Sequence, residues 1–174
     1  MKNNMFSMAT ILSLVVILAA STIMPVLALS DTVQKITTEL DGFVVMFGCC
    51  PDTSVQMKGN IITKSDGTVT LSSQIGSIII GEKTYALKFE PIGNVSTTPD
   101  DICLTSTNHK QPGAVVLTGD DGIVLKGTGV YSWGTALGCP DGDASFTNFS
   151  GKFQDTQGQT IEFFTGTDSL PIIQ

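Results

Sequence analysis

This 174-residue chain has four cysteines, which could form disulfides or bind a metal ion. Cys49 and Cys50 are adjacent, and Cys103 and Cys139 follow singly at long intervals. A zinc site usually draws on closely spaced pairs of cysteine or histidine, and a blue-copper site needs two histidines beside its cysteine. Because the chain has a single histidine and one adjacent cysteine pair, we expect structural disulfides and no metal centre built on cysteine.

The adjacent pair restricts how the four cysteines can be joined. A bond between Cys49 and Cys50 would close a strained ring, so we disfavour it. Neighbouring side chains of an extended backbone point to opposite faces, which suits two separate partners. We therefore expect one member of the pair to bond Cys103 and the other to bond Cys139, with the assignment left open.

Such bonds would bring three irregular parts of the chain together. Loops held on a rigid scaffold are where binding and catalytic side chains are most often found. We therefore expect these loops to form the candidate functional surface. The three segments are 47–54, 91–112 and 134–142.

Aspartates recur in pairs within the same segments. Asp100 and Asp101 are adjacent, and Asp141 and Asp143 flank a glycine. Calcium favours clusters of hard oxygen ligands, so these four residues are the calcium candidates. The segment at 141–143 lacks the glycine and glutamate spacing of an EF-hand loop, and aspartate is common in solvated turns. We expect turn aspartates and no bound cofactor, with calcium as the alternative.

His109, Tyr131 and Trp133 form a candidate ligand surface. Tyr131 and Trp133 alternate with Ser132, which places both rings on one face of a strand. Rings of this kind combine an apolar body with a polar group and suit a sugar or another ligand with an apolar face. His109 has no serine elbow or free cysteine to activate, so no catalytic residues are assigned. The alternative is a hydrolase that uses carboxylates of the irregular segments.

The N-terminal segment predicts export. Lys2 precedes an uncharged run that contains a long apolar stretch, a proline and then small residues up to Ser30. This order is typical of a secretory signal peptide over residues 1–30, and a retained N-terminal membrane anchor is the alternative. Export favours disulfides, and it makes Asn94 and Asn148, which stand in Asn-X-Ser patterns, candidates for glycosylation.

The charge of the chain limits its partners. The formal net charge is −7, and every basic residue is a lysine. Without arginine there is no bidentate group for phosphate, and the net charge repels polyanions. We therefore expect an extracellular or envelope ligand and no nucleic acid, with membrane contact only if the N-terminal segment is retained.

Residues 31–174 predict one β-rich domain. Short apolar runs are separated by turn residues, and Asp-Gly at 66–67 and 121–122 and Gln-Gly at 157–158 predict hairpins. Segment 31–40 fits a helix or a strand equally well. About eight or nine closely spaced strands favour an all-β fold, which we expect to be an antiparallel β-sandwich, with a small closed β-barrel as the alternative.

Together these features predict a secreted or cell-envelope module that binds a ligand or serves as a structural element, without catalysis and with disulfides for stability. Two other functions remain open. One is the carboxylate-dependent hydrolase, and the other is a barrel that carries a small apolar ligand. A carrier barrel would have a hollow interior lined by Tyr85, Leu87 and Phe89.

Overall fold

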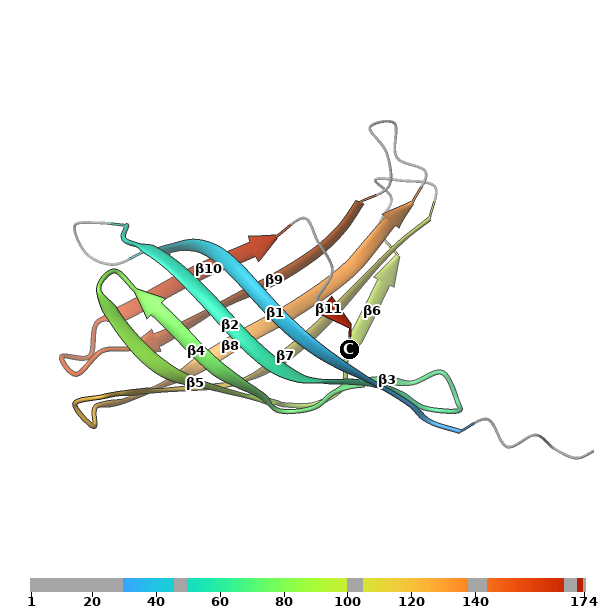
Figure 1. The fold of residues 1–174 in the computed structure, drawn as a ribbon, viewed down its shortest axis with the longest axis horizontal. Helices are drawn as coiled ribbons and strands as arrows, with labels where there is room; N and C mark the ends of the chain where they lie inside the picture. The colour runs from blue at the N-terminus through green and yellow to red at the C-terminus, as the bar shows by residue number, and fades with distance from the viewer. Residues whose placement is uncertain (1–29, 46–49, 100–104, 138–143, 168–171, 174) are drawn as a thin grey trace, which may run out of the picture. The chain divides into compact units, whose positions relative to one another are not determined.

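The computed structural model describes residues 30–45, 50–99, 105–137, 144–167 and 172–173. Residues 31–174 form one compact unit, whereas the predicted signal segment before Ser30 lies outside the described residues. Every regular element in the described part is a β-strand (Figure 1). The strands are β1 (Thr32–Val45), β2 (Asp52–Thr63), β3 (Val69–Leu71), β4 (Gln74–Ile80), β5 (Lys83–Pro91), β6 (Ser96–Pro99), β7 (Thr105–Gly119), β8 (Val124–Leu137), β9 (Ala144–Gln154), β10 (Thr160–Thr167) and β11 (Ile172–Ile173).

Eight of these strands close into an antiparallel barrel. Consecutive strands pair in the order β1, β2, β4, β5, β7, β8, β9 and β10, and β10 then pairs back with β1. The closing contact runs from Asp41 opposite Gly166 to Val45 opposite Glu162. β3 pairs with β2, β6 with β7 and β11 with β1, outside this cycle of eight.

The predicted β-sandwich is therefore wrong, and the barrel alternative is confirmed. A sandwich leaves sheet edges unpaired, whereas β1 here bonds β2 on one side and β10 on the other. Segment 31–40, left open between helix and strand, lies almost wholly in β1. Its side chains alternate, because Ile36 and Leu40 are buried while Lys35 and Glu39 are exposed.

Aromatic rings fill much of the barrel interior. Phe149 packs against Phe89 and Phe163, with ring centroids 5.4 Å and 5.0 Å away, and all three are fully buried. Room for these rings comes from glycines that lie opposite one another on β7, β8 and β9. A Cβ on Gly151, for example, would lie 2.7 Å from the ring of Phe163.

Glycines also close the tight turns. Gly67, Gly122 and Gly158 have φ of 82°, 79° and 80°, in the left-handed region that glycine adopts without strain. All three predicted hairpins are confirmed, since β2 pairs with β3 and β4, β7 with β8, and β9 with β10.

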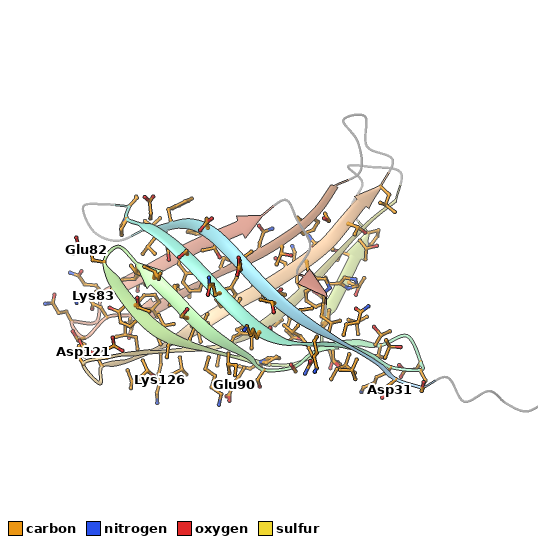
Figure 2. All side chains as sticks on the ribbon, in the orientation of Figure 1. Asp31, Glu82, Lys83, Glu90, Asp121 and Lys126 are labelled. Carbon is orange, nitrogen blue, oxygen red and sulfur yellow. The ribbon has the colours of Figure 1, made fainter. Side chains whose placement is uncertain are left out.

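Because the strands run up and down, their connections alternate between two ends. We call one the turn end; it carries the turns at Gly81, Gly122 and Gly158. We call the other the mouth end; there β1 and β7 begin, at Thr32 and Thr105, and β2 and β8 end. Figure 2 shows Glu82 and Asp121 toward the turn end and Asp31 at the mouth end.

Candidate ligand pocket at the mouth of the barrel

A pocket of about 220 Å³ opens at the mouth end, inside the barrel wall. Residues of β1, β2 and β3 line one side, and residues of β7 and β8 line the other. The lining residues are Gln34, Ile36, Ile61, Thr63, Val69, Thr107, His109, Trp133, Gly134 and Thr135.

The lining is arranged in two layers because inward-facing residues recur every second position along a strand. The deeper layer, which we call the floor, contains rings and branched apolar side chains. The layer nearer the mouth, which we call the rim, contains amide and hydroxyl groups. The floor consists of Ile36, Ile61, His109 and Trp133, and two residues toward the mouth on the same strands lie the rim residues Gln34, Thr63, Thr107 and Thr135.

Trp133 is the largest side chain of the floor. It is only 6% exposed, and it lies between two other rings. The imidazole of His109 stacks on the indole at a centroid distance of 5.1 Å and an interplanar angle of 25°, while Tyr131 lies 5.6 Å away and tilted by 46°. The contact with His109 follows from strand register, because His109 on β7 lies directly opposite Trp133 on β8.

A hydrogen bond holds His109 in this stack. Its Nδ1 lies 2.9 Å from Oγ1 of Thr97, a residue of β6 that pairs with His109 across the sheet. Burial lowers the pKa of His109 below its ordinary value of 6.5. The ring is therefore neutral at pH 7, and the floor carries no charge.

Beneath the floor the interior is closed. The hydroxyl of Tyr131 forms a 2.7 Å hydrogen bond with Oγ1 of Thr38, and both side chains are buried. Burial raises the pKa of Tyr131 far above its usual value of 10, against a smaller lowering by the bond to Thr38. The pocket thus ends on a neutral, hydrogen-bonded layer and does not run through the barrel.

Thr38 and Thr165, which face the interior, are hydrogen-bonded, whereas the rim side chains and the buried Thr147 hydroxyl have no partner within the described residues. Within the described residues, the side chains of Gln34, Thr63, Thr107 and Thr135 make no hydrogen bond to the protein. By contrast, the buried Thr165 donates its hydroxyl to the carbonyl of Phe149 at 2.7 Å, as Thr38 bonds Tyr131. The rim therefore presents polar groups whose partners are free to be water or a ligand.

A larger hollow of about 450 Å³ lies on the outer wall over β7 to β10. Its apolar side chains, such as Ile92, Val130 and Phe164, are exposed and face away from the barrel interior. Nothing in the structure indicates what would cover this surface. We therefore take the mouth pocket as the candidate site.

The structure brings the three residues of the predicted ligand surface into one cluster of rings. His109 and Trp133 line the pocket, while Tyr131 supports Trp133 from below. Tyr85, Leu87 and Phe89, which would line the hollow interior of a carrier barrel, do not line this pocket; Leu87 and Phe89 are buried in the core and Tyr85 packs against it.

Sequence analysis missed the rim and the two isoleucines of the floor. Gln34 and Ile36 lie in the segment left undecided between helix and strand, and Thr107 lies in the stretch taken as irregular because of its prolines. One signal could have found them. Counting outward from the Asp121-Gly122 turn places His109 opposite Trp133 and Thr107 opposite Thr135.

The predicted disulfide and calcium residues lie mostly outside the described part of the chain. Cys50 is exposed and in no disulfide among the described residues. The other cysteines, and the calcium candidates, are not described. Where the structure is described, it contains no group of three or more acidic, histidine or cysteine residues that could hold a metal ion. The undescribed residues are Cys49, Cys103, Cys139, Asp100, Asp101, Asp141 and Asp143.

Both candidate glycosylation residues are exposed. Asn94 lies in the connection between β5 and β6, outside any strand. Asn148 lies within β9, paired with Ser132 and Gly166, and its side chain faces away from the interior. Glycosylation of either stays a prediction.

Comparison of the chain with protein-family models, with curated proteins and with solved structures finds no match. Among the residues that the structure describes, no helix has the length and apolar character needed to cross a membrane.

Proposed function

We propose that this protein is an exported, non-catalytic carrier that binds one small molecule with an apolar face in the mouth pocket. The observation that carries the proposal is the layered lining, in which a floor of Trp133, His109 and two isoleucines lies beneath a rim of free polar groups. Ligand sites are typically apolar concavities with a few polar groups that orient the ligand.

The chemistry of the lining supports binding over hydrolysis. Among the described residues it contains no carboxylate, cysteine or serine, so neither a carboxylate pair nor a serine or cysteine nucleophile faces the pocket. The Nδ1 of His109 bonds a threonine hydroxyl, whereas a catalytic base is commonly oriented by a carboxylate. A hydrolase would have to draw its carboxylates from residues outside this lining.

Export is the second part of the proposal, and it rests on the N-terminal sequence. A lysine followed by a long apolar run and small residues is the pattern of a secretory signal. An acidic surface free of arginine suits a protein that works outside the cytoplasm and does not bind nucleic acid. In that compartment the four cysteines would form disulfides.

Trp133 provides a direct test because it is the only tryptophan of the chain and lies in the pocket floor. We expect small ring compounds to change its fluorescence with a saturable dependence on concentration. Val69→Phe places a ring in the pocket and should weaken this binding at least about tenfold. Val124→Phe is the matched control, because Val124 is exposed at the turn end, and it should bind as the wild type does.

Two results would contradict the proposal. One is a fluorescence signal that no small ring compound changes in the folded wild-type protein. The other is equal binding by Val69→Phe and the wild type, with circular dichroism showing that both retain the strand content of the barrel.

A further inference from the structure

We infer that the ligand of the mouth pocket is an uncharged molecule of one ring, with an apolar ring face and hydrogen-bonding groups along one edge. The inference rests on the proposed function and narrows it to a chemical class. Hydroxylated rings such as monosaccharides and phenols share this chemistry. Three features of the pocket lead to this class: its charge, its two layers and its volume.

The charge of the lining selects a neutral ligand. Among the residues that the structure describes, no Asp, Glu, Lys or Arg lines the pocket. Two lysines lie next to lining residues in the sequence, Lys35 on β1 and Lys110 on β7. Both side chains are exposed, because they alternate with the inward-facing residues of their strands. An ion that enters such a site loses hydration without gaining an opposite charge, which is strongly unfavourable.

The rim selects a ligand with polar groups. Thr107 and Thr135 are direct partners in the β7–β8 register, so their side chains are neighbours on one wall. Gln34 and Thr63 lie on the wall formed by β1 and β2. A pure hydrocarbon would cut all four off from water and leave them without partners, at roughly 1–3 kcal/mol for each group that becomes buried.

The floor favours a ligand with an apolar ring face. Ile36, Ile61 and Trp133 offer apolar surface, and the hydrogen-bonding groups of the floor are limited to the indole N–H of Trp133 and Nε2 of His109. A ring that enters with its apolar face toward Trp133 leaves its polar edge beside the rim. In this orientation the apolar face contacts the floor and the polar edge can form hydrogen bonds with the rim. In the reverse orientation the polar edge would face the apolar floor and the rim would lack partners.

The volume limits the ligand to about one ring. The pocket holds about 220 Å³. A cavity of about 150 Å³ is enough for benzene, and sites for drug-sized ligands begin at about 300 Å³. One six-membered ring with two or three small substituents therefore fits, and a fused multi-ring compound or a long acyl chain does not.

The test compares five single-ring probes by calorimetry and by the fluorescence of Trp133, using the folded chain from residue 31. Resorcinol and methyl glucoside are neutral and hydroxylated, toluene is neutral without hydrogen-bonding groups, and benzoate and benzylammonium carry opposite charges. We expect resorcinol or methyl glucoside to bind at least about tenfold more tightly than the other three, and the better of the two identifies the aromatic or the sugar class.

Threonine variants test the rim directly. Thr107→Val and Thr135→Val remove hydroxyls that bond nothing else among the described residues, so each should weaken the preferred probe roughly 2- to 12-fold without lowering stability. Thr165→Val is the matched control. It removes a hydroxyl bonded to Phe149, so it should lower stability and leave the preference among probes unchanged.

The outcomes separate this inference from the proposed function. Benzoate or benzylammonium binding as tightly as the hydroxylated probes would overturn the neutral class, and toluene binding as tightly would overturn the polar edge; the carrier function would survive both. Failure of all five probes to bind the wild-type protein would overturn the proposed function itself.

Discussion

The hydrogen bond between Thr38 and Tyr131 joins strands on different parts of the wall, 93 residues apart, beneath the pocket floor. Neither hydroxyl has another hydrogen-bond partner within the described residues, and the two side chains are 1% and 0% exposed. Tyr131→Phe therefore leaves the Thr38 hydroxyl buried and unpaired, which should cost about 1–3 kcal/mol of unfolding free energy. Thr38→Val should lower the unfolding free energy by a similar amount, because it leaves the buried hydroxyl of Tyr131 without a hydrogen-bond partner.

The double variant distinguishes this explanation from a simple loss of packing. With both hydroxyls gone, no buried polar group remains unpaired, so we expect the double variant to lose less than the sum of the two single losses by about 1 kcal/mol or more. Urea unfolding at neutral pH, with equal dependence on denaturant in all four proteins, measures this coupling. Strictly additive losses would refute the bond as the source of stability.

The dependence of stability on alkaline pH is a second test of the buried Tyr131 hydroxyl. Because burial raises the pKa of Tyr131, the folded chain keeps a proton that the unfolded chain releases above about pH 10. The stability that depends on this proton is fully present below pH 10 and declines as the pH rises above it. Tyr131→Phe should remove that decline, while ligand binding at neutral pH stays unchanged because the phenyl ring still supports Trp133.

Three further predictions concern other parts of the barrel. Burial lowers the pKa of His109, so the unfolded chain takes up a proton first, and stability should fall as the pH drops below about 6.5; His109→Gln should flatten that dependence in urea unfolding. Gly151→Ala should lower the unfolding free energy by about 1–3 kcal/mol, because its Cβ would lie 2.7 Å from the ring of Phe163; the unfolding midpoint measures this. Mass spectrometry of the mature protein without reductant should find no free thiol, because an exported chain with an even number of cysteines is expected to form disulfides; alkylation of four thiols would contradict this.

Local sequence patterns predicted the hairpins but not how the sheet ends. Glycine at 67, 122 and 158 follows from turn chemistry, which acts over two to four residues. Closure depends on the pairing of Phe43 with Phe164, two exposed residues 121 positions apart that no local signal connects. The same alternation of buried and exposed residues occurs in a β-sandwich, so this pattern does not distinguish a sandwich from a barrel.

The candidate site was partly visible in the sequence for a related reason. Alternation of Tyr131 and Trp133 was enough to place both rings on one face of a strand. His109 was taken as a loop residue because it lies among polar residues in the irregular stretch that ends at Pro112. In the barrel Pro112 is an exposed residue of β7, and the strand continues through it to Thr105. A proline is accommodated there because it faces outward beside Ile92, whose N–H bonds the Pro112 carbonyl.

The expected meeting of the three cysteine-bearing segments stays a prediction, because Cys49, Cys103 and Cys139 lie outside the described residues. In a barrel of alternating strands, successive connections lie at opposite ends, so two connections share an end only when an even number of strands separates them. β7 begins at Thr105 and its barrel neighbour β8 ends at Leu137, so both of these residues lie at the mouth end. Cys50 instead follows β1 and adjoins the turn end, where the Pro51 carbonyl accepts the N–H of Val44. The described residues that flank the cysteines thus lie at opposite ends of the barrel. Because a disulfide joins Cα atoms no more than about 7 Å apart, determining which cysteines are joined is a direct test of the expected pairing.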